Sequence, residues 1–140
     1  MSKVAVIYWS GTGNTAAMAD AVAQGVESAG GKAEVITADA FDAGSMGSYD
    51  AFALGCPAMG MEVLEETVFE PMLLSIEGML SGKKVGLFGS YGWGDGTWMH
   101  NFEDRVKDDG AILVDDGVIA NGYPDADALA SCENLGKMLA

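Results

Sequence analysis

A run of hydroxyl and amide side chains interleaved with glycines lies near the start of the chain. It reads Ser10-Gly11-Thr12-Gly13-Asn14-Thr15. Glycines permit a tight turn, and a helix that begins behind such a turn presents free N–H groups and the positive end of its dipole. The hydroxyls and the amide add neutral donors for phosphate oxygens. Because the run has more donors than helix capping requires, it predicts a phosphate-binding loop.

Two other nucleotide motifs compete for this run. It matches the dinucleotide pattern G-x-G-x-x-A through Gly11, Gly13 and Ala16, and Asp39 lies near where a ribose-binding acid falls, but this match alone is weak. No G-K-[ST] follows the glycines, so the lysine of a nucleoside-triphosphate loop is lacking. A loop with neutral donors and without that lysine favours a ligand with a terminal phosphate monoester over a nucleoside triphosphate.

Two more glycine-rich loops follow apolar runs. They read Cys56-Pro57-Ala58-Met59-Gly60-Met61-Glu62 and Ser90-Tyr91-Gly92-Trp93-Gly94-Asp95-Gly96. Methionines are ordinary packing residues, so Met59 and Met61 taken alone indicate no function. Glycines cannot bury an indole, so we expect Trp93 to be exposed or covered by a ligand, with packing over its own loop as the alternative.

Alternating apolar runs and helical patterns must position these loops. The sequence predicts strands over 4–9, 33–38, 51–56 and 85–89, and a last strand over 112–120 that is interrupted at 115–117. Helical spacing covers 18–29, 63–80, 98–106 and 125–139, with a short helical turn within 39–49. This alternation predicts an α/β fold whose parallel sheet carries helices on both faces. Ligands of such sheets bind beyond the carboxyl ends of the strands, where the three loops lie.

The composition excludes several classes of function. Seven Lys and Arg against 21 Asp and Glu give a net charge of −14, which repels nucleic acid and acidic membranes and attracts a protein with a basic patch. No apolar segment approaches the roughly 18 residues that span a membrane. The N-terminal apolar run is too short for a signal peptide. Cys56 and Cys132 form no C-x-x-C pair, so we expect a reduced, cytoplasmic protein.

Side chains for catalysis or metal binding are scarce. His100 is the only histidine, so the sequence offers no histidine cluster and one candidate for a Ser-His-Asp arrangement. A solvated helix position is the simpler interpretation of His100, and Cys132 shares an apolar helical stripe typical of the core. We therefore expect no catalytic residue and no metal site, and a cofactor would carry any redox chemistry. The length fits a single domain, 1–140.

The three loops together resemble a known family. YWSGTGNT at 8–15, GCPAMGMEVLEE at 55–66 and GKKVGLFGSYGWGDG at 82–96 resemble the short-chain flavodoxins of anaerobic bacteria, over nearly the whole chain. The resemblance implies a flavodoxin-like doubly wound fold with five parallel strands in the order 2-1-3-4-5. It also implies a low-potential one-electron carrier, not an enzyme, whose non-covalently bound FMN shuttles between semiquinone and hydroquinone.

The resemblance further assigns residues to the flavin. The loop at 10–15 would hold the FMN 5′-phosphate. Trp93 would stack on the outer face of the isoalloxazine ring and Met59 on the inner face, Gly60 would turn its carbonyl to N5–H of the semiquinone, and Glu62 would accept from N3–H. Backbone N–H groups around 92–93 would reach the pyrimidine edge. The expected cofactor-binding residues are Ser10, Gly11, Thr12, Gly13, Asn14, Thr15, Pro57, Ala58, Met59, Gly60, Met61, Glu62, Ser90, Tyr91, Gly92, Trp93 and Gly94.

The same resemblance implies partners and leaves alternatives. The partners would be redox proteins with basic docking patches, namely ferredoxin-type reductases and oxidoreductases, and the carrier would be a monomer. An NAD(P)H-dependent FMN reductase on the same fold would need basic groups for a second nucleotide, and Arg105 is the only arginine. A hydride-transferring Rossmann enzyme would need a substrate domain. A receiver domain would need a lysine after the last strand, where Asn121-Gly122 stand.

Overall fold

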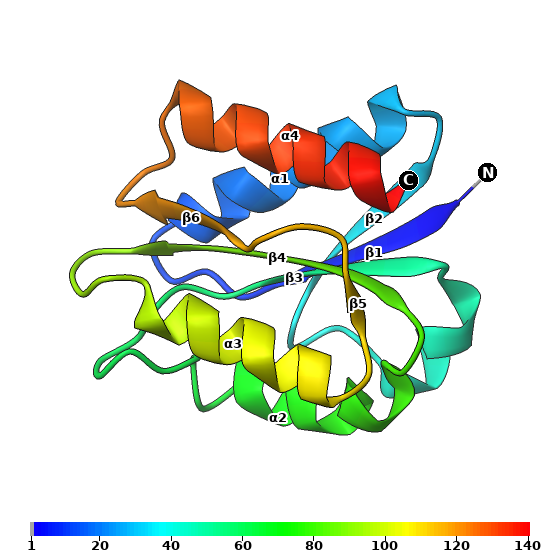
Figure 1. Cartoon of the computed structure of the whole chain (residues 1–140), viewed down its shortest axis with the longest axis horizontal. Helices are drawn as coiled ribbons and strands as arrows, with labels where there is room; N and C mark the ends of the chain where they lie inside the picture. Colours follow the sequence, from blue (N-terminus) through cyan, green and yellow to red (C-terminus); the bar gives the residue numbers. More distant parts are fainter. Residues whose placement is uncertain (1) are drawn as a thin grey trace.

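Six strands, all paired in parallel, form one sheet with two α-helices on each face (Figure 1). The computed structural model describes residues 2–140. The strands are β1 (Lys3–Tyr8), β2 (Lys32–Thr37), β3 (Ala51–Gly55), β4 (Lys84–Tyr91), β5 (Ile112–Leu113) and β6 (Val118–Asn121). The helices are α1 (Asn14–Ser28), α2 (Phe69–Ile76), α3 (Thr97–Asp108) and α4 (Ala126–Leu139), with short 3₁₀ helices η1 (Ala43–Ser48) and η2 (Glu77–Met79).

The strand order confirms the expected topology. The sheet runs β2-β1-β3-β4, and both β5 and β6 then pair with β4, β5 near its start and β6 near its end. The last strand of the order 2-1-3-4-5 is thus split at 114–117, as the interruption in the sequence predicted. Reversal of strand order between β1 and β3 places a crevice at their carboxyl ends.

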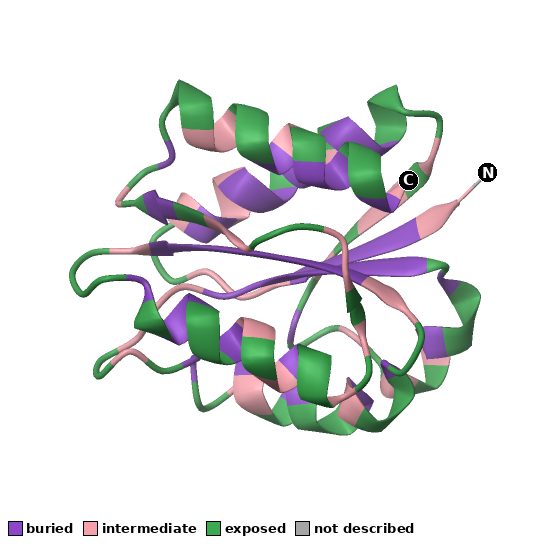
Figure 2. Ribbon diagram, in the orientation of Figure 1, coloured by how far each residue is buried: buried purple, intermediate pink, exposed green. Residues whose placement is uncertain are grey.

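The continuous apolar runs of the central strands are buried on both faces. Val4 and Val6 on β1 pack on the side of α1 and α4, whereas Ala5 and Ile7 pack on the side of α2 and α3. This division follows from the period of two along a strand. Figure 2 shows the consequence, buried central strands between helices that are exposed on their outer surfaces.

Among the boundaries that differ from the sequence prediction, two bear on the loops at the end of the sheet. The helical region expected over 63–80 begins only at Phe69, because the side chain of Glu65 accepts hydrogen bonds from the N–H groups of 67–69 and fixes a turn there. Pro71 lies in the first turn of α2, where the missing N–H is harmless. The fourth strand continues past 89 to Tyr91, so Ser90 and Tyr91 belong to the strand and not to the loop.

Other expectations are confirmed. His100 is exposed on α3, and Cys56 and Cys132 are free and buried. Within residues 2–140, every helix is too short or too polar to cross a membrane.

Candidate functional site

The three glycine-rich loops meet at the carboxyl ends of β1, β3 and β4, at one end of the sheet (Figure 1, left). A cavity of about 280 Å³ lies between them. It is lined by Trp9, Gly11, Thr12, Asn14, Pro57, Ala58, Met59, Ser90, Tyr91, Gly92 and Gly122. Nine of these residues were predicted from the sequence. Trp9 and Gly122 were missed: the sequence predicted Trp9 as the last residue of the first strand and the last strand as ending at 120, whereas β1 ends at Tyr8 and β6 at Asn121, so that each residue directly follows a strand.

The first loop leaves the N-terminus of α1 open. Gly13 stands before the helix at φ 93°, a left-handed conformation that suits glycine, and its N–H donates to Ser10 Oγ at 3.1 Å. No side chain caps the first N–H groups of α1, and its first turn contains no acidic residue.

Carboxylates occupy the starts of the other three α-helices between residues 2 and 140. Glu65 accepts from N–H groups at the start of α2, Glu62 accepts from Trp98 at the start of α3, and Asp125 accepts from Ala128 in α4. In a chain of net charge −14, α1 alone keeps its N–H groups and its positive dipole end for an anion from outside.

Two predicted hydroxyls lie behind the first loop. Thr15 and Ser90 are only 1% and 5% exposed. The backbone N–H of Ser90 donates to Thr15 Oγ1 at 3.4 Å, and the two hydroxyl oxygens are also 3.4 Å apart. These contacts join the first turn of α1 to β4. Because Thr15 Oγ1 accepts from a backbone donor, its own hydroxyl hydrogen can point to Ser90 or to a ligand.

The second loop is a tight hairpin after β3. Met59 and Val63 exchange two backbone hydrogen bonds, with N–H to O distances of 2.8 and 3.1 Å. Gly60 at the tip has φ 47°, in the left-handed region that glycine adopts readily. Glu62 has φ 59° and is the only non-glycine residue in that region among the residues described.

Trp98 fixes the second loop to the start of α3. Its indole N–H donates to the carbonyl of Cys56 at 3.1 Å, and its backbone N–H donates to Glu62 Oε2 at 2.8 Å. The ring is 1% exposed and lies 5.4 Å from the ring of Tyr91. The sequence indicated Trp98 only as the first residue of a helical pattern over 98–106. Its role in positioning the second loop depends on contacts across 36 and 42 residues, which no local pattern reports.

Gly94 must be a glycine because of Glu62. A Cβ atom at position 94 would lie 1.5 Å from Glu62 Oε1, and Gly94 has φ 92°. Glu62 therefore contacts the third loop as well as α3, and its carboxylate has a fixed position between the two loops. It does not line the cavity of about 280 Å³.

A second carboxylate organises the segment between the hairpin and α2. Glu65 is 5% exposed and accepts from the Thr67 hydroxyl and from the N–H groups of Thr67, Val68 and Phe69. Burial alone would raise the pKa of Glu65, but these four donors outweigh it and lower the pKa to about 2. The N–H of Glu65 donates to Cys56 Sγ at 3.3 Å, and burial raises the pKa of that thiol to about 12. Cys56 is therefore an inert neutral thiol beside the site.

Two apolar side chains of the predicted site point into solvent. Trp93 is 84% exposed and Met61 is 91% exposed. The exposure of Trp93 matches the prediction and argues against packing over its own loop. Neither residue lines the cavity, and Gly60 and Gly94 also lie outside its lining. Ser10 and Gly13 border a neighbouring cavity of about 250 Å³ together with Trp9 and Asp39.

The positive charges are segregated along the strand direction, whereas acidic residues occur at both ends of the sheet. All seven lysines and arginines lie at the amino end of the sheet: Lys3, Lys32, Lys83 and Lys84 at strand starts, and Arg105, Lys107 and Lys137 in the last turns of α3 and α4. Acidic residues follow the carboxyl ends of the strands, as Asp39, Glu62, Asp95 and Asp125. The end with the three loops therefore combines negative potential with one uncapped helix N-terminus.

This arrangement can bind a terminal phosphate at α1 and a flat, largely apolar group between the second and third loops. Among residues 2–140 no three His, Cys, Asp or Glu side chains are grouped as metal ligands. The sequence profile of the flavodoxin family matches residues 6–136.

Individual relatives match over almost their full length. The chain is 44% identical over 135 residues to a flavodoxin of Clostridium beijerinckii, covering 96% of this chain and 97% of the relative. It is 43% identical to a flavodoxin of Megasphaera elsdenii, covering 98% of each. The solution structure of two-electron reduced Megasphaera elsdenii flavodoxin superimposes with a TM-score of 0.87, covering 97% of both chains at 43% identity.

Proposed function

The chain belongs to the flavodoxin family, which consists of FMN-containing electron carriers and not enzymes, and we propose that its three glycine-rich loops hold the FMN. The chain thus transfers electrons one at a time at low potential between other redox proteins. Bound FMN supplies the redox chemistry, and the residues of the chain bind it, orient it and set its potential.

The observation that carries the site assignment is the open N-terminus of α1. Phosphate would take the N–H groups that no side chain caps, together with the hydroxyls of Ser10, Thr12 and Thr15 and the amide of Asn14. Gly11 and Gly13 give the turn its close approach. The absence of a lysine or arginine at this end selects a phosphate held by neutral donors.

The other two loops are proposed to hold the ring. Met59 and the exposed Trp93 would cover its two faces, and the backbone of Gly60 and the carboxylate of Glu62 would meet its polar edge. Pro57, Ala58, Met61 and the segment 90–94 complete the set. The left-handed backbone of Gly60 and the fixed carboxylate of Glu62 support these roles.

The electrostatics favour a low potential. A single negative charge about 8 Å away opposes one more negative charge by about 2 kcal/mol at an effective dielectric constant of 20, before screening by salt. Glu62 is held near the ring by Trp98 and Gly94, and acidic residues follow four of the strands at this end. These charges disfavour a reduction step when that step adds negative charge to the site.

The partners, assembly and compartment follow as proposals. An acidic end without lysine or arginine suits redox partners with basic docking patches, such as ferredoxin-type reductases and oxidoreductases. Like charges on two copies oppose self-association, so we place the protein as a single-domain monomer. Two free, buried cysteines fit the reducing cytoplasm.

The test is titration of the apoprotein with FMN, FAD and riboflavin. FMN should bind far more tightly than riboflavin, because riboflavin lacks the phosphate, and equal affinities would refute the phosphate site. Ala16→Asp would put a carboxylate into the first turn of α1. We expect this variant to lose FMN affinity while the apoprotein becomes more stable, because the carboxylate caps the helix.

A matched control adds the same charge elsewhere on α1. Gln24→Glu, at an exposed position far from the helix start, should leave FMN affinity nearly unchanged. Incubation of the holoprotein with NADPH separates the carrier from a reductase on the same fold. A carrier keeps its oxidised flavin spectrum, and rapid bleaching without an added reductase would favour the reductase.

A further inference from the structure

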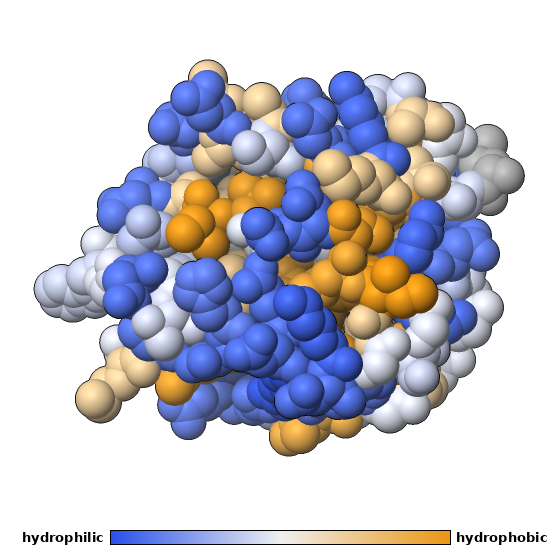
Figure 3. Space-filling model, in the orientation of Figure 1, coloured by the Kyte–Doolittle hydropathy of each residue, from blue (hydrophilic) through white to orange (hydrophobic). Residues whose placement is uncertain are grey.

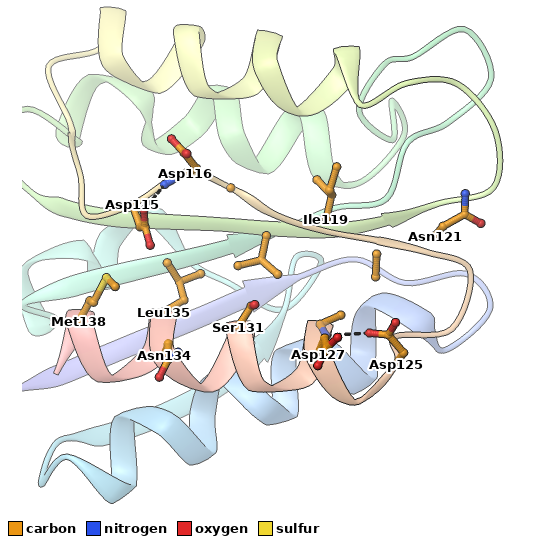
Figure 4. Close-up of a pocket in the computed structure, with 14 residues that line it drawn as sticks. Asp115, Asp116, Ile119, Asn121, Asp125, Asp127, Ser131, Asn134, Leu135 and Met138 are labelled. Carbon is orange, nitrogen blue, oxygen red and sulfur yellow. Dashed lines mark hydrogen bonds between the residues drawn. The ribbon is translucent and has the colours of Figure 1, made fainter.

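A further cavity lies at the edge of the sheet, outside the three loops. It is a groove of about 580 Å³ between β6 and α4 (Figure 4). Val118 and Ala120 on β6 form one wall, and Ser131, Leu135 and Met138 on α4 form the other. Figure 4 shows Ser131 and Leu135 pointing from α4 toward the strand. Nothing in the electron-carrier site uses this groove.

The strand that borders the groove has an open edge. β6 pairs only with β4, so its outer N–H and C=O groups have no strand partner within residues 2–140. Its sequence, Val-Ile-Ala-Asn, contains neither the charges nor the proline that commonly protect an edge strand. The opposite edge, β2, carries Lys32 and Glu34. Figure 3 shows apolar side chains in a band where β5 and β6 run, above the hydrophilic surface of α3.

Both ends of the groove are acidic. Asp115 and Asp116 lie at one end, Asp125 and Asp127 lie at the other, and no lysine or arginine lines it (Figure 4). Two copies of this chain that paired through β6 would bring these carboxylates together, so the charges oppose self-association. The same charges attract an extended segment with lysine or arginine side chains.

We propose that this groove binds a basic, extended segment of a partner protein, which adds to the sheet as a strand beside β6. Backbone hydrogen bonds to β6 would supply affinity, and alternating apolar and basic side chains would meet the groove and its acidic ends. β6 ends at Asn121, and the next residue, Gly122, lines the cavity at the three loops. A segment paired with β6 therefore leads to the electron-transfer site. The proposal does not depend on the identity of the cofactor.

The test uses the ¹⁵N-labelled holoprotein and a synthetic peptide, acetyl-Lys-Val-Lys-Val-Lys-Val-amide, followed by NMR. We expect amide shifts concentrated in 115–121 and 125–138, with slower hydrogen exchange at Ile119 and Asn121. The same peptide with N-methyl groups on its three valines keeps the charges but loses strand pairing along one edge. It should bind about tenfold more weakly or worse, since each net hydrogen bond contributes about 1 kcal/mol.

Two double variants distinguish the effect of the carboxylates in the groove from the effect of the overall negative charge. Asp115→Asn with Asp127→Asn should weaken peptide binding by about fivefold to tenfold, because two close ion pairs are removed. Asp20→Asn with Asp104→Asn removes the same charge from exposed positions on α1 and α3 and should weaken it less than twofold.

Three outcomes would overturn the proposal. They are shifts confined to the three loops, equal binding of the N-methylated peptide, and equal effects of the two double variants. Concentration-dependent dimerisation through β6 at moderate salt, measured by sedimentation, would also overturn it, because the edge would then pair with a second copy.

Discussion

Glu62 Oε2 accepts a hydrogen bond from the backbone N–H of Trp98 at 2.8 Å, so a residue of the hairpin after β3 caps α3 across a separation of 36 residues. The cap fixes a negative charge at the candidate flavin site. It also makes the second loop, the third loop and α3 one connected unit. A change in any of them should alter the others.

Replacement of Glu62 by glutamine tests the charge apart from the hydrogen bond. Gln keeps an oxygen that can accept from Trp98, so the fold should be retained. Loss of the charge should raise the second one-electron midpoint potential by about 40–90 mV, which corresponds to about 1–2 kcal/mol at partial screening. The first potential should move less. Spectroelectrochemical titration measures both, and Glu66→Gln, which removes an exposed neighbouring charge, is the control. Equal shifts of the second midpoint potential in the two variants would show that Glu62 does not lie at the flavin edge.

Replacement of Gly94 by alanine tests the contact between the loops. The added Cβ would collide with Glu62 Oε1 and would be strained at φ 92°. We expect the apoprotein to lose about 2–3 kcal/mol of unfolding free energy from strain and from loss of the α3 cap. Gly92→Ala, in the same loop, meets no atom within 4 Å and should change stability by less than about 0.5 kcal/mol. Urea denaturation measures the unfolding free energy of both variants. Similar losses in the two variants would contradict the prediction, because the collision with Glu62 would then not be the cause of the loss.

Glu65 should make stability depend on pH in the acid range. Its pKa is about 2 in the fold and 4.5 in the unfolded chain, so the ionised carboxylate stabilises the fold above about pH 4.5 and this contribution is lost as the pH falls toward 2. Glu65→Gln places an amide against four donors and should destabilise the protein by about 2–3 kcal/mol at pH 7. The difference from the parent should narrow below pH 4.5. A difference that stays constant from pH 7 to pH 3.5 would contradict the assigned pKa.

Asp109 should give the opposite dependence of stability on pH. Burial and the neighbouring Glu77 raise its pKa from 3.8 to about 6, although Arg105 opposes the shift, and its buried Oδ2 has no hydrogen-bond partner. The protonated form is therefore favoured in the fold, and stability falls as the pH rises from about 4 to 6 and stays reduced above. Asp109→Asn mimics the protonated form. It should stabilise the protein by about 1 kcal/mol at pH 7.5 and have little effect at pH 4. Asp108→Asn removes a charge from the neighbouring exposed position and should stabilise the protein less at pH 7.5.

The strands and loops were predictable because they depend on local sequence. Continuous apolar runs marked strands buried on both faces, and glycines marked the turns at their ends. The start of α2 was not predictable in this way, since 63–68 has helical spacing and only the inward position of Glu65 turns its carboxylate into a cap. The pairing of Thr15 with Ser90, and of Glu62 with Trp98, depends on tertiary positions 75 and 36 residues apart. Most residues that line the cavity were found by their loop, whereas the contacts that hold the loops together were not.

Segregation of every lysine and arginine at the amino end of the sheet gives the molecule a large electric dipole moment along its strands. A basic partner thus exerts a torque on the carrier as well as an attraction. The torque rotates the carrier before contact, so that the end with the three loops faces the partner. Net charge and dipole can be varied separately. Lys84→Glu replaces a positive charge at the amino end of the sheet by a negative charge. The net charge then becomes more negative, whereas the dipole moment becomes smaller. If orientation limits productive encounters at low salt, this variant will associate with its partner strongly and exchange electrons with it more slowly.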